Sequence, residues 1–578
     1  MGRAILPAAA FQAARSHRGA SVRARKRRLM AGCSQFRFAR RRLAPQPRKD
    51  WNENKELCPV CSRVAAPLLI WLLLAAAVCP AQDYVDQVVE RARQEFDVPG
   101  IAVAIVKDGN VVLAKGYGVR KLGEAAPVTA HSLFRIASNT KAFTAAALAM
   151  LVDEGKLRWD DAVIQHMPGF QMYDPYVTRE LTVRDLLVHR SGLGLGAGDL
   201  MFFPPSDLSR AEIVQRLRFV KPATSFRSRY AYDNLLYLVA GQLIPAVTGK
   251  GWDDFVKERI FVPLGMTSTN AGTPALKAAS DVALPHSKAG GKLEALPHED
   301  VDNNAPAGAI NSCVADLAKW VTLQLNHGDM GSARLFSEAQ SKEMWSAQTI
   351  IPIGAPAALG ALSPNFSAYG LGWRLDDYRG KKIVSHTGGL SGYVSRVTMI
   401  PELKLGVVVL TNQEADGAFQ AVTYTILDHY LGAPESDWVA PFLAQARQGE
   451  TGAEEAVKQA SAKRNANSRP SLPLADYAGR YRDAWYGDVA IEEHSGKLTI
   501  SFTHTRQLTG DLEHWQYDTF VARWRDRSLA ADAYVTFSLK PNGSVDEVKM
   551  APVSPATDFS FDFQDLLLRP IAATTPPR

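Results

Sequence analysis

A serine and a lysine three residues apart are the first side chains in this sequence whose types and spacing could do covalent chemistry. Ser138 and Lys141 stand at the start of an apolar, helix-favouring run, residues 140–154, which Gly155 ends. Positions i and i+3 of a helix share one face, so the hydroxyl and the amine can meet there. A hydroxyl becomes a good nucleophile only when a base takes its proton, and a partly desolvated lysine can be that base. This spacing also occurs by chance, so it needs partners elsewhere in the chain.

A tyrosine and an asparagine downstream are the first candidate partners. Tyr232 and Asn234 are separated by one residue and directly precede an apolar helical run, residues 235–244. A phenol can pass a proton, and a side-chain amide can hold a substrate carbonyl. Taken alone, Tyr232 could equally be a core residue and Asn234 a helix cap.

A second candidate motif, His386-Thr387-Gly388-Gly389, ends a strand-like run that begins at residue 382. A backbone N–H group at the edge of a strand can bind an oxyanion, and glycine lets a substrate backbone approach closely. Taken alone, the histidine could simply begin a turn.

The elements around these motifs predict an α/β fold. Apolar residues at helical spacing cover residues 85–96, and a hairpin is predicted for residues 101–114 around Asp108-Gly109-Asn110. Strand-like runs follow at residues 383–385, 396–400 and 405–411, and a helix is expected at residues 418–431. Sheet elements at both ends of a helical middle indicate an antiparallel sheet flanked by helices, with an inserted helical domain and a site between them. We expect this domain to span residues 82–433.

The C-terminal part of the chain has a different pattern. Residues 434–471 are polar and read as a linker with some helix, and residues 472–570 hold short alternating strands split by turns. A small antiparallel β-barrel or sandwich is the natural interpretation. Core packing is favoured over a ligand cavity for its aromatic residues Trp485, Tyr486, Trp515 and Trp524.

The basic charge of the chain belongs to its first residues. Residues 1–63 hold 16 lysines and arginines against three acidic residues, whereas the remaining chain holds 50 basic and 56 acidic residues. The body therefore lacks the basic character typical of nucleic-acid binding.

An apolar stretch at residues 64–78 follows Arg63 and ends before Cys79-Pro80-Ala81, which is the build of a signal peptide. The stretch is shorter than the ~20 residues that a membrane-spanning helix needs. We expect residues 1–81 to be a leader and the protein to be periplasmic or secreted, with an uncleaved membrane anchor as the alternative. Removal of the leader, which contains a Cys58-x-x-Cys61 pair, would leave Cys313 as a buried, unpaired thiol.

Taken together, the motifs resemble the serine β-lactamase and penicillin-binding superfamily, in particular its β-lactamase-related branch of peptidases and esterases. The resemblance spans residues 84–431 and rests on residues 133–141, the turn at residues 189–193, Pro306-Ala307-Gly308 and residues 386–392. From residue 474 onward, Tyr477-Ala478-Gly479 and Trp485-Tyr486-Gly487 resemble the lipocalin-like barrel appended to some of these peptidases.

The resemblance implies roles for the candidate residues. Ser138 would be the acylated nucleophile, Lys141 its base, and Tyr232 the group that passes the proton to the leaving group. Asn234, His386, Thr387 and Gly388 would bind substrate, and the backbone N–H groups of Ser138 and Gly389 would form the oxyanion hole. No cofactor and no metal are implied.

One residue departs from the β-lactamase pattern. His386 stands where dedicated β-lactamases and carboxypeptidases carry a lysine, and histidine is mostly neutral at pH 7. Strong recognition of a substrate carboxylate is therefore not expected, and esters, amides or peptides become the favoured substrates.

The leading hypothesis is an exported serine hydrolase that forms an acyl-enzyme. Alternatives are a β-lactamase or D-Ala-D-Ala carboxypeptidase, a non-catalytic sensor or binding protein of the same fold, and a scaffold whose barrel forms homo-oligomers that gate the site. A zinc site at His286, His298, Glu299 and Asp300 fits no common spacing, and a solvated loop is the favoured interpretation there.

Overall fold

The computed structural model describes residues 80–289, 291–354 and 357–571. The predicted signal segment at residues 64–78 and the Cys58-x-x-Cys61 pair lie outside the described residues. Within the described ranges, no helix is both long and apolar enough to cross a membrane. Cys313 is a buried free thiol, as predicted.

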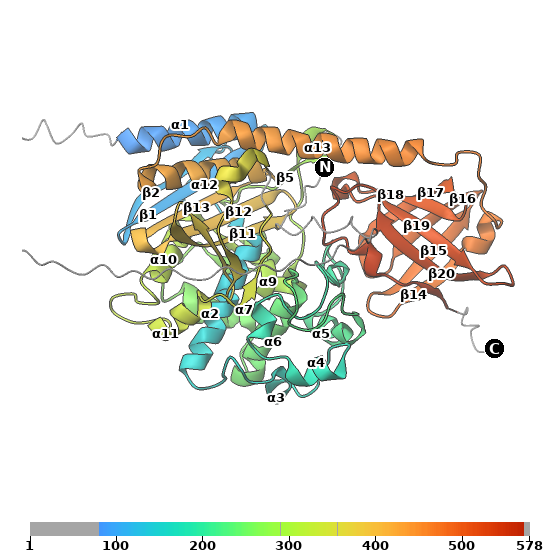
Figure 1. Ribbon diagram of the computed structural model, residues 1–578, viewed down its shortest axis with the longest axis horizontal. Helices are drawn as coiled ribbons and strands as arrows, with labels where there is room; N and C mark the ends of the chain where they lie inside the picture. Colours follow the sequence, from blue (N-terminus) through green and yellow to red (C-terminus); the bar gives the residue numbers. More distant parts are fainter. Residues whose placement is uncertain (1–79, 290, 355–356, 572–578) are drawn as a thin grey trace, which may run out of the picture. The chain divides into compact units, whose positions relative to one another are not determined.

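An antiparallel sheet forms the centre of the first part of the chain (Figure 1). Its strand order in the described residues is β2-β1-β13-β12-β11-β10-β9-β8. The strands are β1 (Gly100–Lys107), β2 (Asn110–Gly118), β8 (Thr349–Ile350), β9 (Ser367–Tyr369), β10 (Arg374–Tyr378), β11 (Lys381–Leu390), β12 (Tyr393–Ile400) and β13 (Leu405–Thr411). The predicted hairpin is confirmed: Lys107 pairs with Asn110 around Asp108 and Gly109, both of which have positive φ, as a type I′ turn requires.

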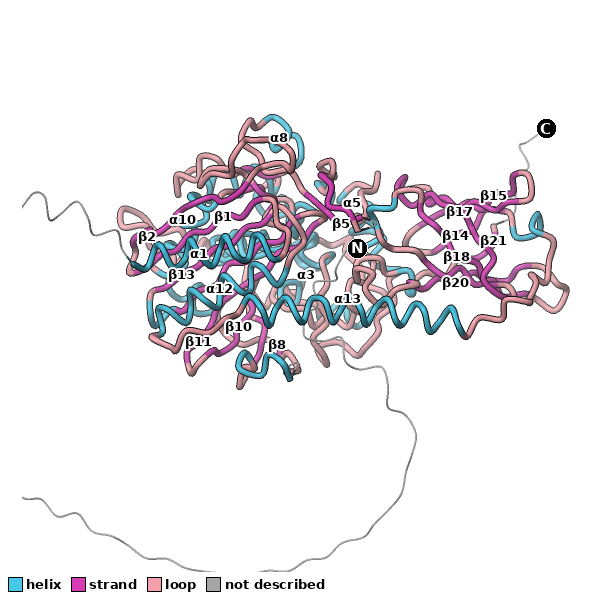
Figure 2. The backbone as a smooth tube through the Cα atoms, turned by 90° about the horizontal axis from the view of Figure 1, so that it is seen from above, coloured by secondary structure: helices cyan, strands magenta, loops and turns pink. Residues whose placement is uncertain are grey.

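Alternating side chains of β1 separate two cores. Ile101, Val103 and Ile105 pack with helices α1 (Pro80–Glu95) and α12 (Asp416–Leu431). Ala102 and Ala104 face a second core that includes α2 (Thr140–Asp153) and α10 (Val314–Leu325). Helices therefore cover both faces of the sheet, as Figures 1 and 2 show. The predicted α/β fold with an antiparallel sheet between helices is confirmed.

The predicted helical middle lies between β2 and β8. Its main helix, α2 (Thr140–Asp153), is buried from Thr140 to Leu151, because several helices and the sheet surround it. Its alanine-rich sequence favours the helix and permits close packing on all sides. The other helices are α3 (Val163–His166), α4 (Pro175–Glu180), α5 (Arg210–Arg216), α6 (Leu235–Thr248), α7 (Trp252–Val256), α8 (Thr273–Ala278), α9 (Ala305–Gly308) and α11 (Glu338–Met344).

Two small sheets complete this region. One consists of β3 (Phe134–Arg135), β7 (Ile310–Ser312) and β4 (Asn270–Ala271), and the other of β5 (His286–Ala289) and β6 (Lys292–Ala295). The interpretation of a solvated loop is wrong for His286. Its side chain is buried, and its ring nitrogens are bonded to the backbone N–H of Leu122 and the carbonyl of Asn412.

The C-terminal part forms a nearly closed antiparallel barrel, preceded by a helix. Helix α13 (Val439–Ala462) occupies most of the predicted linker. The strands are β14 (Gly479–Asp483), β15 (Gly487–His494), β16 (Lys497–Phe502), β17 (Thr505–Gln516), β18 (Thr519–Trp524), β19 (Ala533–Leu539), β20 (Val545–Pro552) and β21 (Arg569–Pro570). A bridge between Val548 and Leu568 joins the two ends of the sheet. The predicted barrel is confirmed, while the exact domain boundaries stay predictions.

Aromatic side chains fill the barrel. Trp485, Tyr486 and Trp524 are buried, and Trp524 stacks on Phe563. Trp515 is half-buried and packs against Tyr534.

Candidate active site

Ser138 lies in a strained turn at the start of α2. It belongs to the 3-10 turn η1 (Ala137–Asn139), in which Ala137 has a φ of 45°, a left-handed conformation that costs energy for a residue with a Cβ. Ser395 Oγ donates to the Ile136 carbonyl at 2.8 Å and accepts from Asn139 Nδ2 at 2.8 Å. These contacts from β12 hold the turn, and with it the Ser138 hydroxyl, in one position.

Strand β11 packs directly on this turn. A Cβ on Gly388 would overlap the Ile136 carbonyl oxygen and would lie 2.9 Å from the Ser138 nitrogen, so only glycine permits this approach. In the described sheet, the last residue of β11 that pairs with β10 is Ser385, so residues 386–390 extend past that neighbour. An unpaired strand edge can present backbone N–H groups to a ligand. The packing explains Gly388 structurally, while its predicted contact with substrate stays a prediction.

Lys141 is fully buried and has three polar neighbours. Its Nζ lies 3.1 Å from Ser138 Oγ, 2.7 Å from Asn234 Oδ1 and 3.1 Å from the Ala307 carbonyl oxygen. The amide and backbone oxygens can only accept hydrogen bonds, whereas the serine hydroxyl can also donate. A neutral Lys141 can therefore donate to both carbonyl oxygens and turn its lone pair toward the Ser138 proton.

The neutral form of Lys141 is accessible near pH 7. Burial lowers the pKa of its ammonium to about 7, because the charged form loses its hydration. The negative charges of Asp199 and Asp233 act in the opposite direction. The balance gives a lysine that can gain or lose a proton under physiological conditions, which is what a general base requires.

Asn234 is held from both sides. Its Oδ1 accepts from Lys141, and its Nδ2 donates to Asp199 Oδ2 at 2.8 Å. Its side chain does not cap α6, since Asp233 Oδ1 accepts the Leu236 N–H at the start of that helix. Asn234 therefore occupies the N-cap position of α6, as the alternative interpretation expected, but its side-chain amide serves the pocket and not the helix end.

Tyr232 lines the pocket and lies next to Lys141. Lys141 Nζ lies 4.8 Å from the centroid of its ring, which also packs on His189 at 4.3 Å. Burial raises the pKa of the Tyr232 phenol well above its ordinary value, and a hydrogen bond with the Ser138 hydroxyl opposes that rise. The predicted Tyr232 and Ser138 are thus brought into contact.

His386 is neutral and uses both ring nitrogens within the protein. Its Nδ1 lies 2.6 Å from the Thr387 carbonyl, which can only accept, so its Nε2 accepts from the Tyr369 hydroxyl at 2.7 Å. Burial, together with the nearby charge of Lys141, lowers the pKa of His386 to about 3. The ring therefore carries no charge that could pair with a substrate carboxylate.

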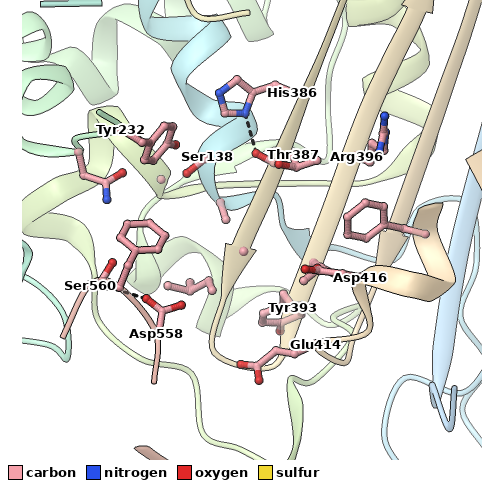
Figure 3. Close-up of a pocket in the computed structure, with 18 of the residues that line it drawn as sticks. Ser138, Tyr232, His386, Thr387, Tyr393, Arg396, Glu414, Asp416, Asp558 and Ser560 are labelled. Atoms are coloured by element: carbon pink, nitrogen blue, oxygen red, sulfur yellow. Dashed lines mark hydrogen bonds between the residues drawn. The ribbon is translucent and has the colours of Figure 1, made fainter. Parts of the chain in front are cut away.

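One pocket of about 390 Å³ is lined by six of the predicted residues: Ser138, Tyr232, Asn234, His386, Thr387 and Gly389. Lys141 and Gly388 are not among its lining residues. Figure 3 shows Ser138, Tyr232, His386 and Thr387 gathered at one end of the pocket. The figure also labels six other residues that line the pocket: Tyr393, Arg396, Glu414, Asp416, Asp558 and Ser560. No group of three or more histidine, cysteine, aspartate or glutamate side chains in the described part of the chain could hold a metal ion.

Sequence reasoning missed three residues that contribute to this site. Asp199, in the 3-10 turn η3 (Asp199–Met201), contacts Asn234, and Phe559 of the C-terminal part packs edge-on against Tyr232 with ring centroids 6.2 Å apart. Ser560 follows Phe559 and donates from Oγ to Asp199 Oδ2 at 2.8 Å. Nothing in the sequence of residues 558–562 indicates that this segment lies near Ser138 in the folded chain.

The sequence of this chain matches a known protein family and several known proteins. Residues 85–431 match the family described as Beta-lactamase, and residues 463–570 match a domain of unknown function, DUF3471. The chain is 31% identical over 490 residues to an unguisins hydrolase of Aspergillus violaceofuscus, a match that covers 79% of this chain and 85% of the relative. It is 28% identical over 351 residues to the protein flp of Staphylococcus aureus, which covers 58% and 64% of the two chains.

A solved structure has the same fold. The octameric penicillin-binding protein homologue from Pyrococcus abyssi superposes with a TM-score of 0.56 and 23% sequence identity. The match covers 84% of this chain and 99% of that structure.

Proposed function

The chain belongs to the β-lactamase family and is a serine hydrolase, and we propose that it hydrolyses its substrates through an acyl-enzyme on Ser138. The observation that carries this proposal is the environment of Lys141. Of its three polar neighbours, only the Ser138 hydroxyl has a proton to give.

In the proposed first step, neutral Lys141 takes the Ser138 proton while Oγ forms a bond to the substrate carbonyl carbon. The carbonyl π electrons move to oxygen, and the N–H groups of Ser138 and Gly389 stabilise the resulting oxyanion. Collapse of this intermediate breaks the bond to the leaving group, which receives its proton through Tyr232. The hydrogen bond between Tyr232 and the Ser138 hydroxyl, and the position of Lys141 Nζ 4.8 Å from the centroid of the Tyr232 ring, support that path.

In the second step, water attacks the acyl ester. Lys141 takes a proton from the water, the ester bond to Oγ breaks, and Ser138 recovers its proton. In this proposal Asn234 holds Lys141 through Oδ1 while the outer face of its amide lies in the pocket. Thr387, which also lines the pocket, is proposed to bind the substrate along the edge of β11.

The proposed substrates are esters, amides or peptides. A neutral His386, bonded on both sides within the protein, supports this choice over a β-lactam or a D-Ala-D-Ala carboxylate. A relative named as a hydrolase of unguisins belongs to the same family.

A substrate panel tests the proposal. p-Nitrophenyl esters, L- and D-amino-acid peptides and nitrocefin are assayed with the wild type and with Ser138→Ala, and mass spectrometry follows covalent labelling by a fluorophosphonate. We expect ester or peptide turnover and one label per chain, both abolished by Ser138→Ala. Turnover that survives Ser138→Ala would refute the mechanism, and tight reversible binding without labelling would favour a binding protein instead.

We further propose that the protein is exported. The apolar segment at residues 64–78 supports this location. N-terminal sequencing of the protein recovered from the periplasm or medium should give a start near residue 82. Homo-oligomerisation through the barrel is likewise a proposal, to be checked by the mass of the intact protein in solution.

A further inference from the structure

Asp199 is a buried carboxyl group that the acyl-enzyme mechanism does not use. Its Oδ2 accepts two hydrogen bonds, from Asn234 Nδ2 and from Ser560 Oγ, both at 2.8 Å. Its Oδ1 is buried and has no hydrogen-bond partner among the described residues. Burial raises the pKa of the Asp199 carboxyl well above its usual value, and the two donated hydrogen bonds oppose this rise. Each of these bonds therefore favours the ionised form of Asp199.

Asp199 determines which end of the Asn234 amide faces the catalytic lysine. Asp199 Oδ2 accepts from the Ser560 hydroxyl, so it acts as an acceptor toward Asn234 as well and requires the NH₂ group of that amide on its side. The carbonyl oxygen of the same amide must then face Lys141 Nζ, where it accepts at 2.7 Å. The reversed amide would set two donors against each other at Lys141 and two acceptors against each other at Asp199.

The C-terminal segment holds the turn that carries Asp199. Asp562 accepts the backbone N–H of Gly198 at 2.6 Å and that of Leu200 at 3.2 Å, one on each side of Asp199. A Cβ on Gly196 would lie 2.8 Å from the Phe559 carbonyl oxygen, so the two segments fit closely. Side chain and backbone of the Asp199 turn are thus both fixed by residues 559–562, far away in sequence.

We propose that Ser560 and Asp199 are positioning residues, through which the C-terminal part of the chain orients Asn234 and sets the protonation of Lys141. The inference rests on the proposed function, because it assigns these residues a role in the activation of Ser138. Hydrogen bonds run from Ser560 to Asp199, from Asn234 to Asp199 and from Lys141 to Asn234.

The expected effect on pH dependence follows from the charges around Lys141. The titratable groups that face it are Asp199, Asp233, His189, His386, Tyr232 and Tyr237. The charge of Asp199 raises the pKa of Lys141. Loss of that charge lets the pKa of Lys141 fall, so the acid limb of the activity profile moves to lower pH.

The rate of Ser138 labelling by a fluorophosphonate, measured in the full chain from pH 5 to 9, tests the inference without a known substrate. In this reaction the Oγ–P bond forms, fluoride leaves with the P–F electrons, and the serine proton passes to Lys141. For Ser560→Ala we expect a plateau rate about tenfold lower, the usual effect of one lost hydrogen bond to a charged group. We also expect an acid limb about one pH unit lower. Asp199→Asn should move the limb in the same direction.

Two further variants serve as controls. Ser560→Thr keeps the hydroxyl, so its plateau rate and the pH of its acid limb should equal those of the wild type. Ser538→Ala removes an exposed hydroxyl of the same barrel and should also match the wild type. A Ser560→Ala profile that superposes on the wild type, or that is lower with an unmoved limb, would overturn the inference, since a merely structural role does not shift a pKa. Labelling that persists in Ser138→Ala, or that is absent from the wild type, would instead refute the proposed function itself.

Discussion

Lys141 Nζ lies 3.1 Å from Ser138 Oγ, and the two other neighbours of Nζ are carbonyl oxygens that cannot donate a proton. When Lys141 is protonated, it can donate a hydrogen bond to each of the three oxygens. When it is neutral, its lone pair can accept a hydrogen bond, and only the Ser138 hydroxyl can donate one to it. The same three oxygens therefore form hydrogen bonds with both protonation states of Lys141. The pocket needs no rearrangement when the proton passes from Ser138 to Lys141.

The first prediction concerns pH. Because Lys141 must be neutral to act as the base and burial brings its pKa to about 7, kcat/KM should rise with pH through about 7 and then level off. Below that value, kcat/KM should fall tenfold for each pH unit. The measurement is kcat/KM on a neutral ester whose own ionisation does not change between pH 5 and 9. A profile that is flat down to pH 5 would exclude Lys141 as the base.

The second prediction concerns removal of the lysine charge. Lys141→Met should reduce kcat/KM by about 10²–10⁴, the usual contribution of a general base. The melting temperature should stay the same or increase, since a fully buried ammonium pays a desolvation cost that methionine does not. Steady-state kinetics and thermal unfolding measure the two effects. Lys342→Met, at an exposed lysine, is the matched control and should change neither quantity.

The part of the site carried by local spacing could be predicted from the sequence. Ser138 and Lys141 meet because three residues make almost one helical turn, and the Asp108-Gly109 turn fixes the hairpin for an equally local reason. The apolar run at residues 101–106 also identified the first strand, and the structure adds that Ile101, Val103 and Ile105 face a different core from Ala102 and Ala104.

The part of the site that depends on long-range packing could not be predicted in this way. Asp199 and Ser560 are 361 residues apart in sequence, and only the folded chain brings Oγ within 2.8 Å of the carboxylate. The bonding of His386 was missed for the same reason, because its partner Tyr369 comes from another strand. The structure places His386 in the lining of the pocket with both ring nitrogens bonded within the protein, and its contact with substrate stays a prediction.

The third prediction concerns stability at acid pH. A histidine has a pKa near 6.5 when unfolded, and burial lowers that of His386 to about 3, so the folded state excludes a proton that the unfolded state binds. The contribution of neutral His386 to the free energy of unfolding is therefore fully present above pH 6.5. It is lost as the pH falls from 6.5 toward 3, by up to about 1.4 kcal/mol per pH unit.

Denaturant unfolding of the wild type and of His386→Asn at several pH values from 4 to 8 measures this effect. We expect the variant to be less stable at pH 8, because the Tyr369 and Thr387 hydrogen bonds are weakened, and the difference to shrink or reverse toward pH 4. A difference that is constant across the range would mean that His386 does not titrate on unfolding.

The fourth prediction separates packing from substrate binding at Gly388. Because a Cβ there would overlap the Ile136 carbonyl, Gly388→Ala should force β11 away from the turn that holds Ser138. We expect a loss of about 1–3 kcal/mol in the free energy of unfolding, as overpacked sites show. A fall in kcat should accompany it, because displacement of Ser138 disturbs the reacting geometry. Gly169→Ala, where nothing lies within 4 Å of the added Cβ, is the control for the backbone effect of the exchange. If Gly388 acted only by contact with substrate, Gly388→Ala would instead raise KM and leave both the unfolding free energy and kcat at their wild-type values.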